Sequence, residues 1–316
     1  MSTYKQIAGT NIEVLSSDPA NPVEGQVWYN STSNTVKANF DNPGSWATGN
    51  NLNTAREELA GCGIQTAALA FGGNPTTGAT ESYDGSSWTE LNDLNTGRSL
   101  LAGAGTQTLA LAFGGSVAPG GLTESWNGTS WTEVNDLNTV RSRLAGAGTQ
   151  TAALAVGGEA PPGSPLLAQT ELFNGTDWTE VNDLNTGRAF LAAAGTNTAA
   201  LAFGGDNVGG VANTESWNGT NWTEVNDLNT ARQKLGGAGT QTLALAFGGS
   251  PLTGATESWN GTSWTEVGDL NIIRETPSGA GSDNTSALAF GGKGPAATAA
   301  TEEFNAGPQT ITFTDS

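Results

Sequence analysis

The sequence predicts an all-β fold, a β-propeller of six four-stranded blades, and three observations carry this prediction. A unit of 42 to 47 residues recurs six times along the chain, and this period is typical of one propeller blade. Glycine accounts for 45 of the 316 residues while lysine and arginine together number 11, which favours turns and strands over helices. Large length differences between units fall in one segment only, as expected of a loop on a fixed frame.

Each unit carries the same three sequence marks. It opens with an L-N-T-x-R motif, continues to an aromatic residue or valine followed by two glycines, and closes with T-E-S-W-N-G-T-S-W-T-E-V or a variant. We interpret two recurring positions as structural, with each arginine paired to a repeat carboxylate such as Glu124 or Asp136. These positions are Arg56, Arg98, Arg141, Arg188, Arg232 and Arg274, and Trp46, Trp88, Trp131, Trp178, Trp222 and Trp264.

Four strands are expected in each unit. Two short apolar runs, 100–105 and 109–114, predict a hairpin whose first strand is rich in small residues and lies nearest the axis. Segments 123–126 and 131–134 alternate polar and apolar residues and are joined through Asn127-Gly128, a pair typical of tight hairpins. One such sheet buries both faces only when units stack radially.

The chain ends are predicted to close the ring. We expect residues 41–316 to form the propeller and residues 1–40 to form an attachment segment with an added hairpin at 24–37. The strand at Trp46, the C-terminal strand at 310–313, or both complete the last blade.

Two resemblances to known families follow from these motifs. The spacing of arginine, glycine doublet, aromatic residue and tryptophan over residues 46–313 resembles kelch repeats, which implies propeller blades in which the doublet ends the second strand. The string P-x-E-G-Q-x-W-Y-N-S-T at 22–32 resembles the amino-terminal segments of phage tail and appendage proteins. This second resemblance implies attachment to a virion.

Composition excludes several function classes. The net charge of −19 repels phosphate backbones, so no nucleic-acid partner is expected. Residues 1–15 contain no continuous apolar run, so neither an export signal nor membrane insertion is expected. The chain has no histidine and one cysteine, Cys62, which excludes Ser-His-Asp chemistry and imidazole metal sites; we interpret Cys62 as a buried apolar residue.

No cofactor and no catalytic residue are predicted. The recurring Asp-Leu-Asn sequences suggest either calcium ligands or turn formers, and they lack the spacing of an EF-hand loop. The 30 acidic residues leave a catalytic carboxylate pair open, but none stands out from the repeat.

The sequence favours a non-enzymatic virion structural or tail-appendage protein that binds a host-surface glycan or protein through its variable loops. Virion proteins are the expected partners of the amino-terminal segment, and a homo-oligomer is an open alternative. A cytoplasmic kelch-type scaffold and, less favoured, a carbohydrate-active enzyme are the other hypotheses. The loop residues predicted to bind are Asn74, Thr76, Pro119, Pro161, Pro162, Pro165, Asp206, Asn207 and Lys293.

Overall fold

The computed structural model describes residues 12–117, 120–160 and 166–313, which form strands and turns. Across these residues there is no helix of the length and hydropathy that a membrane span needs. The chain divides into two compact units, one comprising Ser45–Asn305 and the other Met1–Gly44 with Ala306–Ser316.

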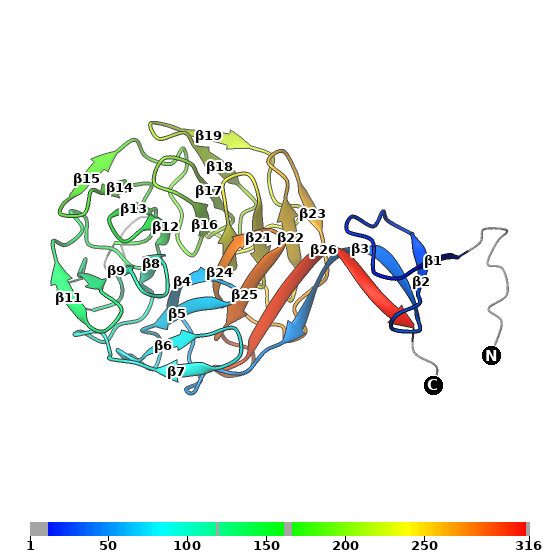
Figure 1. Cartoon of the computed structure of the whole chain (residues 1–316). Helices are drawn as coiled ribbons and strands as arrows, with labels where there is room; N and C mark the ends of the chain where they lie inside the picture. Colours follow the sequence, from blue (N-terminus) through cyan, green and yellow to red (C-terminus); the bar gives the residue numbers. More distant parts are fainter. Residues whose placement is uncertain (1–11, 118–119, 161–165, 314–316) are drawn as a thin grey trace. The chain divides into compact units, whose positions relative to one another are not determined.

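In the larger unit, antiparallel sheets of four strands follow one another around an axis (Figure 1). The first blade contains β4 (Ala60–Ile64), β5 (Ala67–Phe71), β6 (Thr80–Tyr83) and β7 (Trp88–Glu90). The second contains β8 (Ala102–Gly105), β9 (Ala110–Phe113), β10 (Thr123–Trp126) and β11 (Trp131–Val134). The third contains β12 (Ala145–Thr149), β13 (Ala152–Val156), β14 (Thr170–Phe173) and β15 (Trp178–Val181).

The next two blades repeat this order. The fourth contains β16 (Ala192–Gly195), β17 (Ala200–Phe203), β18 (Thr214–Trp217) and β19 (Trp222–Val225). The fifth contains β20 (Gly236–Gly239), β21 (Ala244–Phe247), β22 (Thr256–Trp259) and β23 (Trp264–Glu266).

The sixth repeat belongs to a larger sheet, and here the predicted count of blades is wrong. Its strands β24 (Ser278–Asp283), β25 (Ser286–Phe290) and β26 (Thr301–Phe313) continue through β3 (Thr35–Thr48) and β2 (Val27–Asn30) to β1 (Glu13–Leu15), so this sheet has six strands. The structure therefore has five four-stranded blades rather than six. The reason is the length of β3, 14 residues, whose first part pairs with β2.

Trp46 and the sixth repeat close the ring of the larger unit. The indole of Trp46 donates a hydrogen bond to Thr256 Oγ1 at 3.0 Å, and its carbonyl accepts one from Asn271 Nδ2 at 2.9 Å. The innermost strand of this repeat, β24, contacts β20 on one side and β4 on the other.

The same indole bond joins each blade to the one before it. Trp131 donates to Thr80 Oγ1 at 3.0 Å, and Trp178 donates to Thr123 Oγ1 at 3.1 Å. Equivalent bonds run from Trp88 to Thr301, from Trp222 to Thr170 and from Trp264 to Thr214. The repeat tryptophans therefore stabilise the junctions between blades.

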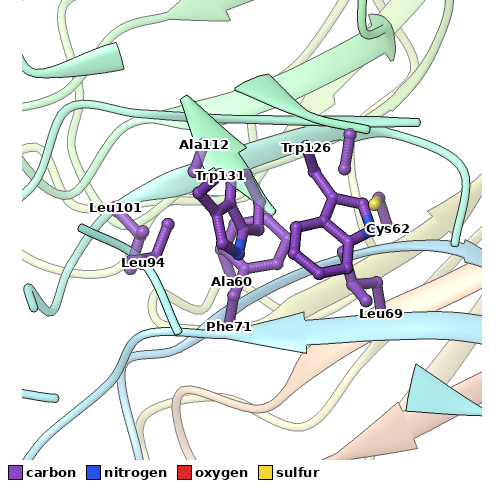
Figure 2. Close-up of a cluster of buried hydrophobic side chains, with 10 residues drawn as sticks. Ala60, Cys62, Leu69, Phe71, Leu94, Leu101, Ala112, Trp126 and Trp131 are labelled. Carbon is purple, nitrogen blue, oxygen red and sulfur yellow. The ribbon is translucent and has the colours of Figure 1, made fainter. Parts of the chain in front are cut away.

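The hydrophobic core lies between neighbouring blades. In one cluster, Phe71 and Leu69 from β5 pack against Trp126 and Trp131 of the next blade, and Cys62 lies at its edge (Figure 2). The rings of Phe71 and Trp131 are 5.0 Å apart. This side-by-side packing explains why β5 is buried on both faces and why one unit alone has no complete core.

Each repeat arginine is buried within its own blade and lies beside a glutamate. Arg98 lies 2.5 Å from Glu124, with side chains 0% and 2% exposed, and Asn95 Nδ2 donates to the same carboxylate at 2.9 Å. Of the two carboxylates that the sequence offers, Glu124 is the partner, because Asp136 instead accepts the backbone N–H of Thr123. The other pairs are Arg56–Glu81, Arg141–Glu171, Arg188–Glu215, Arg232–Glu257 and Arg274–Glu302.

The smaller unit contains the β2–β3 hairpin and a group of hydrogen bonds centred on Asp18. The Asp18 carboxylate accepts hydrogen bonds from Trp28, Asn30 and Lys37. These bonds lower the pKa of Asp18 to about 2, and the bond from Lys37 has the largest effect.

Candidate functional site

Six equivalent positions near the axis have a left-handed backbone although none is glycine. Each lies two residues after a repeat arginine, with φ between 52° and 59°. Such a conformation is uncommon for non-glycine residues, and it concentrates at functional sites. The six residues are Glu58, Leu100, Arg143, Phe190, Lys234 and Thr276, and we call them the axial residues.

Backbone hydrogen bonds between blades account for this conformation. The amide of Leu100 donates to the Glu58 carbonyl at 2.9 Å, and the amide of Arg143 donates to the Leu100 carbonyl at 2.9 Å. The series continues through Phe190 and Lys234 to Thr276, at 2.8, 2.9 and 2.7 Å. The chain thus links all six repeats near the axis whatever side chain each position carries.

The axial residues surround a cavity of about 120 Å³ at one mouth of the axial channel. Five leucines and a proline, each next in the chain to an axial residue, line its wall: Leu59, Leu101, Leu144, Leu191, Leu235 and Pro277. Deeper in, the channel is lined by the small residues of the innermost strands. The mouth is therefore where the varied side chains gather.

The bases of the variable loops lie at the same mouth. The residue between each repeat arginine and axial residue pairs through its backbone with the first residue after a glycine doublet, as in Glu57 with Asn74 and Ala189 with Asp206. The same pairing joins Ser142 to Glu159 and Glu275 to Lys293. The axial residues and the bases of the loops consequently form one surface.

All spare cations of the propeller gather at this surface. Of the 11 lysines and arginines, six are the buried repeat arginines and two, Lys5 and Lys37, precede the propeller in the sequence. The remaining three are Arg143, Lys234 and Lys293. In a chain with a net charge of −19, this concentration marks the mouth as chemically distinct.

These cations form a continuous run of contacts that we call the polar arc. Arg143 pairs with Glu159, and its guanidinium lies 4.9 Å from the centre of the Phe190 ring. On the next blade, Lys234 lies 5.5 Å from the same ring centre and 3.3 Å from Glu275. The arc ends with Lys293, whose ammonium lies 3.3 Å from Glu57. The polar arc therefore comprises Glu159, Arg143, Phe190, Lys234, Glu275, Lys293 and Glu57.

Glu58 adds a carboxyl group to the cavity wall. Its burial raises the pKa of the carboxyl group above the ordinary value, while a hydrogen bond with Ser99 and the charges of Arg143 and Lys234 act in the opposite direction. Thr276 also lines the cavity, and its hydroxyl is buried. The mouth thus offers donors, acceptors and apolar surface together.

The predicted loop residues lie partly at this site. Asn74 donates to Glu57 Oε1 at 3.3 Å, and Lys293 belongs to the polar arc. Asp206 accepts the amide of Gly209, whereas Thr76 and Asn207 are exposed on their loops. Pro119, Pro161, Pro162 and Pro165 lie outside the described residues.

Sequence reasoning missed Arg143, Phe190 and Lys234. The signal was present in the R-x-x-L motif, where two positions differ between repeats that otherwise agree closely. Their positions in the sequence did not reveal that these residues meet near the axis, because each comes from a different blade.

In the described parts of the chain, no group of three or more acidic, histidine or cysteine side chains could hold a metal ion. The free thiol of Cys62 is buried.

No family model and no curated protein matches the chain. Among solved structures, "Structure of YjhT" matches with a TM-score of 0.66, covering 79% of this chain and 95% of that one. The chain has a β-propeller fold. Since the two sequences are 13% identical, this likeness concerns the fold and carries no activity from YjhT to the present chain.

Proposed function

We propose that this chain is a non-enzymatic, kelch-type recognition protein of a virion surface structure, where it binds a host-surface glycan or protein. The observation that supports this proposal is the contrast between a uniform frame and a varied mouth. Neighbouring repeats share their arginine, glutamate and tryptophan bonds, whereas their axial residues are all different. A rigid scaffold that varies at one surface is typical of recognition.

Residues 1–40 are the proposed attachment segment. This role rests on the string at 22–32, which resembles phage tail and appendage segments. Virion proteins, or further copies of the chain, are its proposed partners.

Binding is favoured over catalysis by the state of the polar arc and of Tyr83. The carboxylates of the polar arc are each held by a cation, and a base must be free to take up a proton in the reaction. Tyr83, which replaces a repeat tryptophan, is 1% exposed, and its hydroxyl donates to Glu303 at 2.5 Å. That hydroxyl is not presented to a substrate.

The test is a cell-binding assay with labelled intact protein and with a version that lacks residues 1–40, on a panel of bacterial hosts. We expect both to bind the same hosts, because recognition is assigned to the propeller. Thr76→Arg and Asn207→Arg, which place bulky charges on exposed loops of the variable surface, should reduce binding.

Leu109→Arg is the matched control, since Leu109 is 50% exposed at the opposite end of its strand from the glycine doublet. The proposal fails if neither protein binds any host cell. It also fails if only residues 1–40 are needed for binding.

A further inference from the structure

The polar arc has no excess of positive charge. Each of its three cations is paired with a carboxylate, and Glu58 adds a further acidic group at the cavity. The whole chain carries a net charge of −19, so its long-range field repels anions. An acidic ligand would have to displace Glu159 or Glu275 and approach against this field, which argues against an anion site.

The ion pairs nevertheless keep exposed hydrogen-bonding atoms. Arg143 and Glu159 are 35% and 18% exposed, and Lys234 and Glu275 are 29% and 20% exposed. Such partly exposed pairs contribute little to stability, so a polar group is able to bind beside them at low cost. A hydroxyl group suits these pairs best, because it donates to a carboxylate and accepts from a cation at once.

The size and wall of the cavity set a second constraint. Its volume of about 120 Å³ is below the roughly 300–1,000 Å³ of sites that enclose a drug-sized ligand. The cavity therefore takes one ring at the end of a longer molecule. Phe190 and the neighbouring leucines supply apolar wall for the carbon-bound hydrogens of that ring.

We propose that the polar arc binds an uncharged terminal sugar ring of a surface glycan. Its hydroxyl groups accept from Arg143 and Lys234 and donate to Glu159 and Glu275, while Phe190 contacts the apolar side of the ring. This inference rests on the proposed function and narrows its ligand to neutral saccharides.

The test begins with the full-length chain on a printed array of oligosaccharides that end in neutral hexoses, N-acetylhexosamines or uronic acids. The strongest neutral oligosaccharide is then titrated calorimetrically at low and high sodium chloride. We expect neutral termini to bind, with an affinity that salt changes little, because no net charge is neutralised.

Three variants probe the arc directly, namely Arg143→Met, Lys234→Met and Glu275→Gln. Each should weaken binding of the oligosaccharide about tenfold or more, the effect of losing one charged hydrogen bond. Glu133→Gln, which changes an exposed carboxylate on β11, is the control that should bind as the parent does. Equal thermal unfolding temperatures exclude a folding defect.

Preference for uronic acid termini, with affinity that falls as salt rises, would overturn the inference. Unchanged binding by all three arc variants would also overturn it, and if those variants still bind host cells the proposed function stands. Absence of binding to both array and cells contradicts the proposed function as well.

Discussion

At the residue scale, one position in each innermost strand needs a small residue because the neighbouring blade packs closely against it. A Cβ atom added at Gly103 would lie 2.6 Å from Phe71 Cζ of the neighbouring blade, and one at Gly146 would lie 2.8 Å from Phe113 Cζ. The fourth blade has Ala193 at this position, and the blade before it has Val156 in place of phenylalanine. Where one blade has alanine in place of this glycine, its neighbour thus has a smaller side chain in place of phenylalanine.

Gly103→Ala should destabilise the protein by about 1–3 kcal/mol, the usual cost of overpacking. The same change should be neutral or stabilising in a Phe71→Val background, because the shorter side chain leaves room for the added methyl group. Free energies of unfolding in denaturant for the two single variants and the double variant measure this coupling. Equal costs of Gly103→Ala in both backgrounds would contradict the steric explanation.

At the scale of the blade, the buried ion pair joins three segments that are distant in sequence. Glu124 on β10 accepts from Arg98 and from both the backbone and side chain of Asn95, while Arg98 also donates to the Ala112 carbonyl on β9 at 3.2 Å. Burying the two charges is costly by itself. Their role is to hold the segment before β8 onto the sheet, which in turn positions the axial residue Leu100.

Glu124→Ala should lower the free energy of unfolding by about 3–5 kcal/mol, because it leaves the Arg98 charge buried without its partner. The double variant Arg98→Met with Glu124→Leu should lose less, since it buries no unpaired charge. Glu133→Ala on the exposed face of β11 is the control, with an expected change within about 0.5 kcal/mol. A double variant less stable than Glu124→Ala would contradict this account.

At the scale of the whole molecule, the two junctions of the sixth repeat join segments from both ends of the chain, and Trp46 completes one of them. Trp46 lies 5.1 Å from both Phe247 and Phe304, so it joins the fifth blade to the sixth repeat. Its contacts connect residues more than 200 positions apart, as in its bond to Thr256. Closing this junction therefore costs more loop entropy than joining blades that are neighbours in sequence.

Trp46→Ala should therefore loosen the ring at one place. We expect hydrogen exchange to increase in Ser278–Asp283, Ser286–Phe290 and the end of β3, whereas Trp131→Ala should increase exchange around β10 and β11. Both variants remove a similar buried side chain, at a cost of about 3–5 kcal/mol, which makes them a matched pair. An even increase across all blades in Trp46→Ala would show that the junction has no special part in closure.

The sequence by itself determined the repeat, the strands and the residues that recur. Glycine doublets, Asn-Gly turns and alternating apolar residues act over a few positions, so blades such as β8–β11 were predictable from local pattern. The buried Arg98 was predictable as structural because its position recurs in every repeat. The axial residues were not, because variation among repeats does not say where in space the varied positions meet.

Only the tertiary structure decided the six-stranded sheet and the polar arc. The length of β3 and its pairing with both β2 and β26 depend on contacts between the two ends of the chain, which carry no repeat signal. The arc brings Arg143, Phe190 and Lys234 together from three blades. Radial stacking is a long-range consequence of burying sheet faces, and it converts one variable position per repeat into a single site.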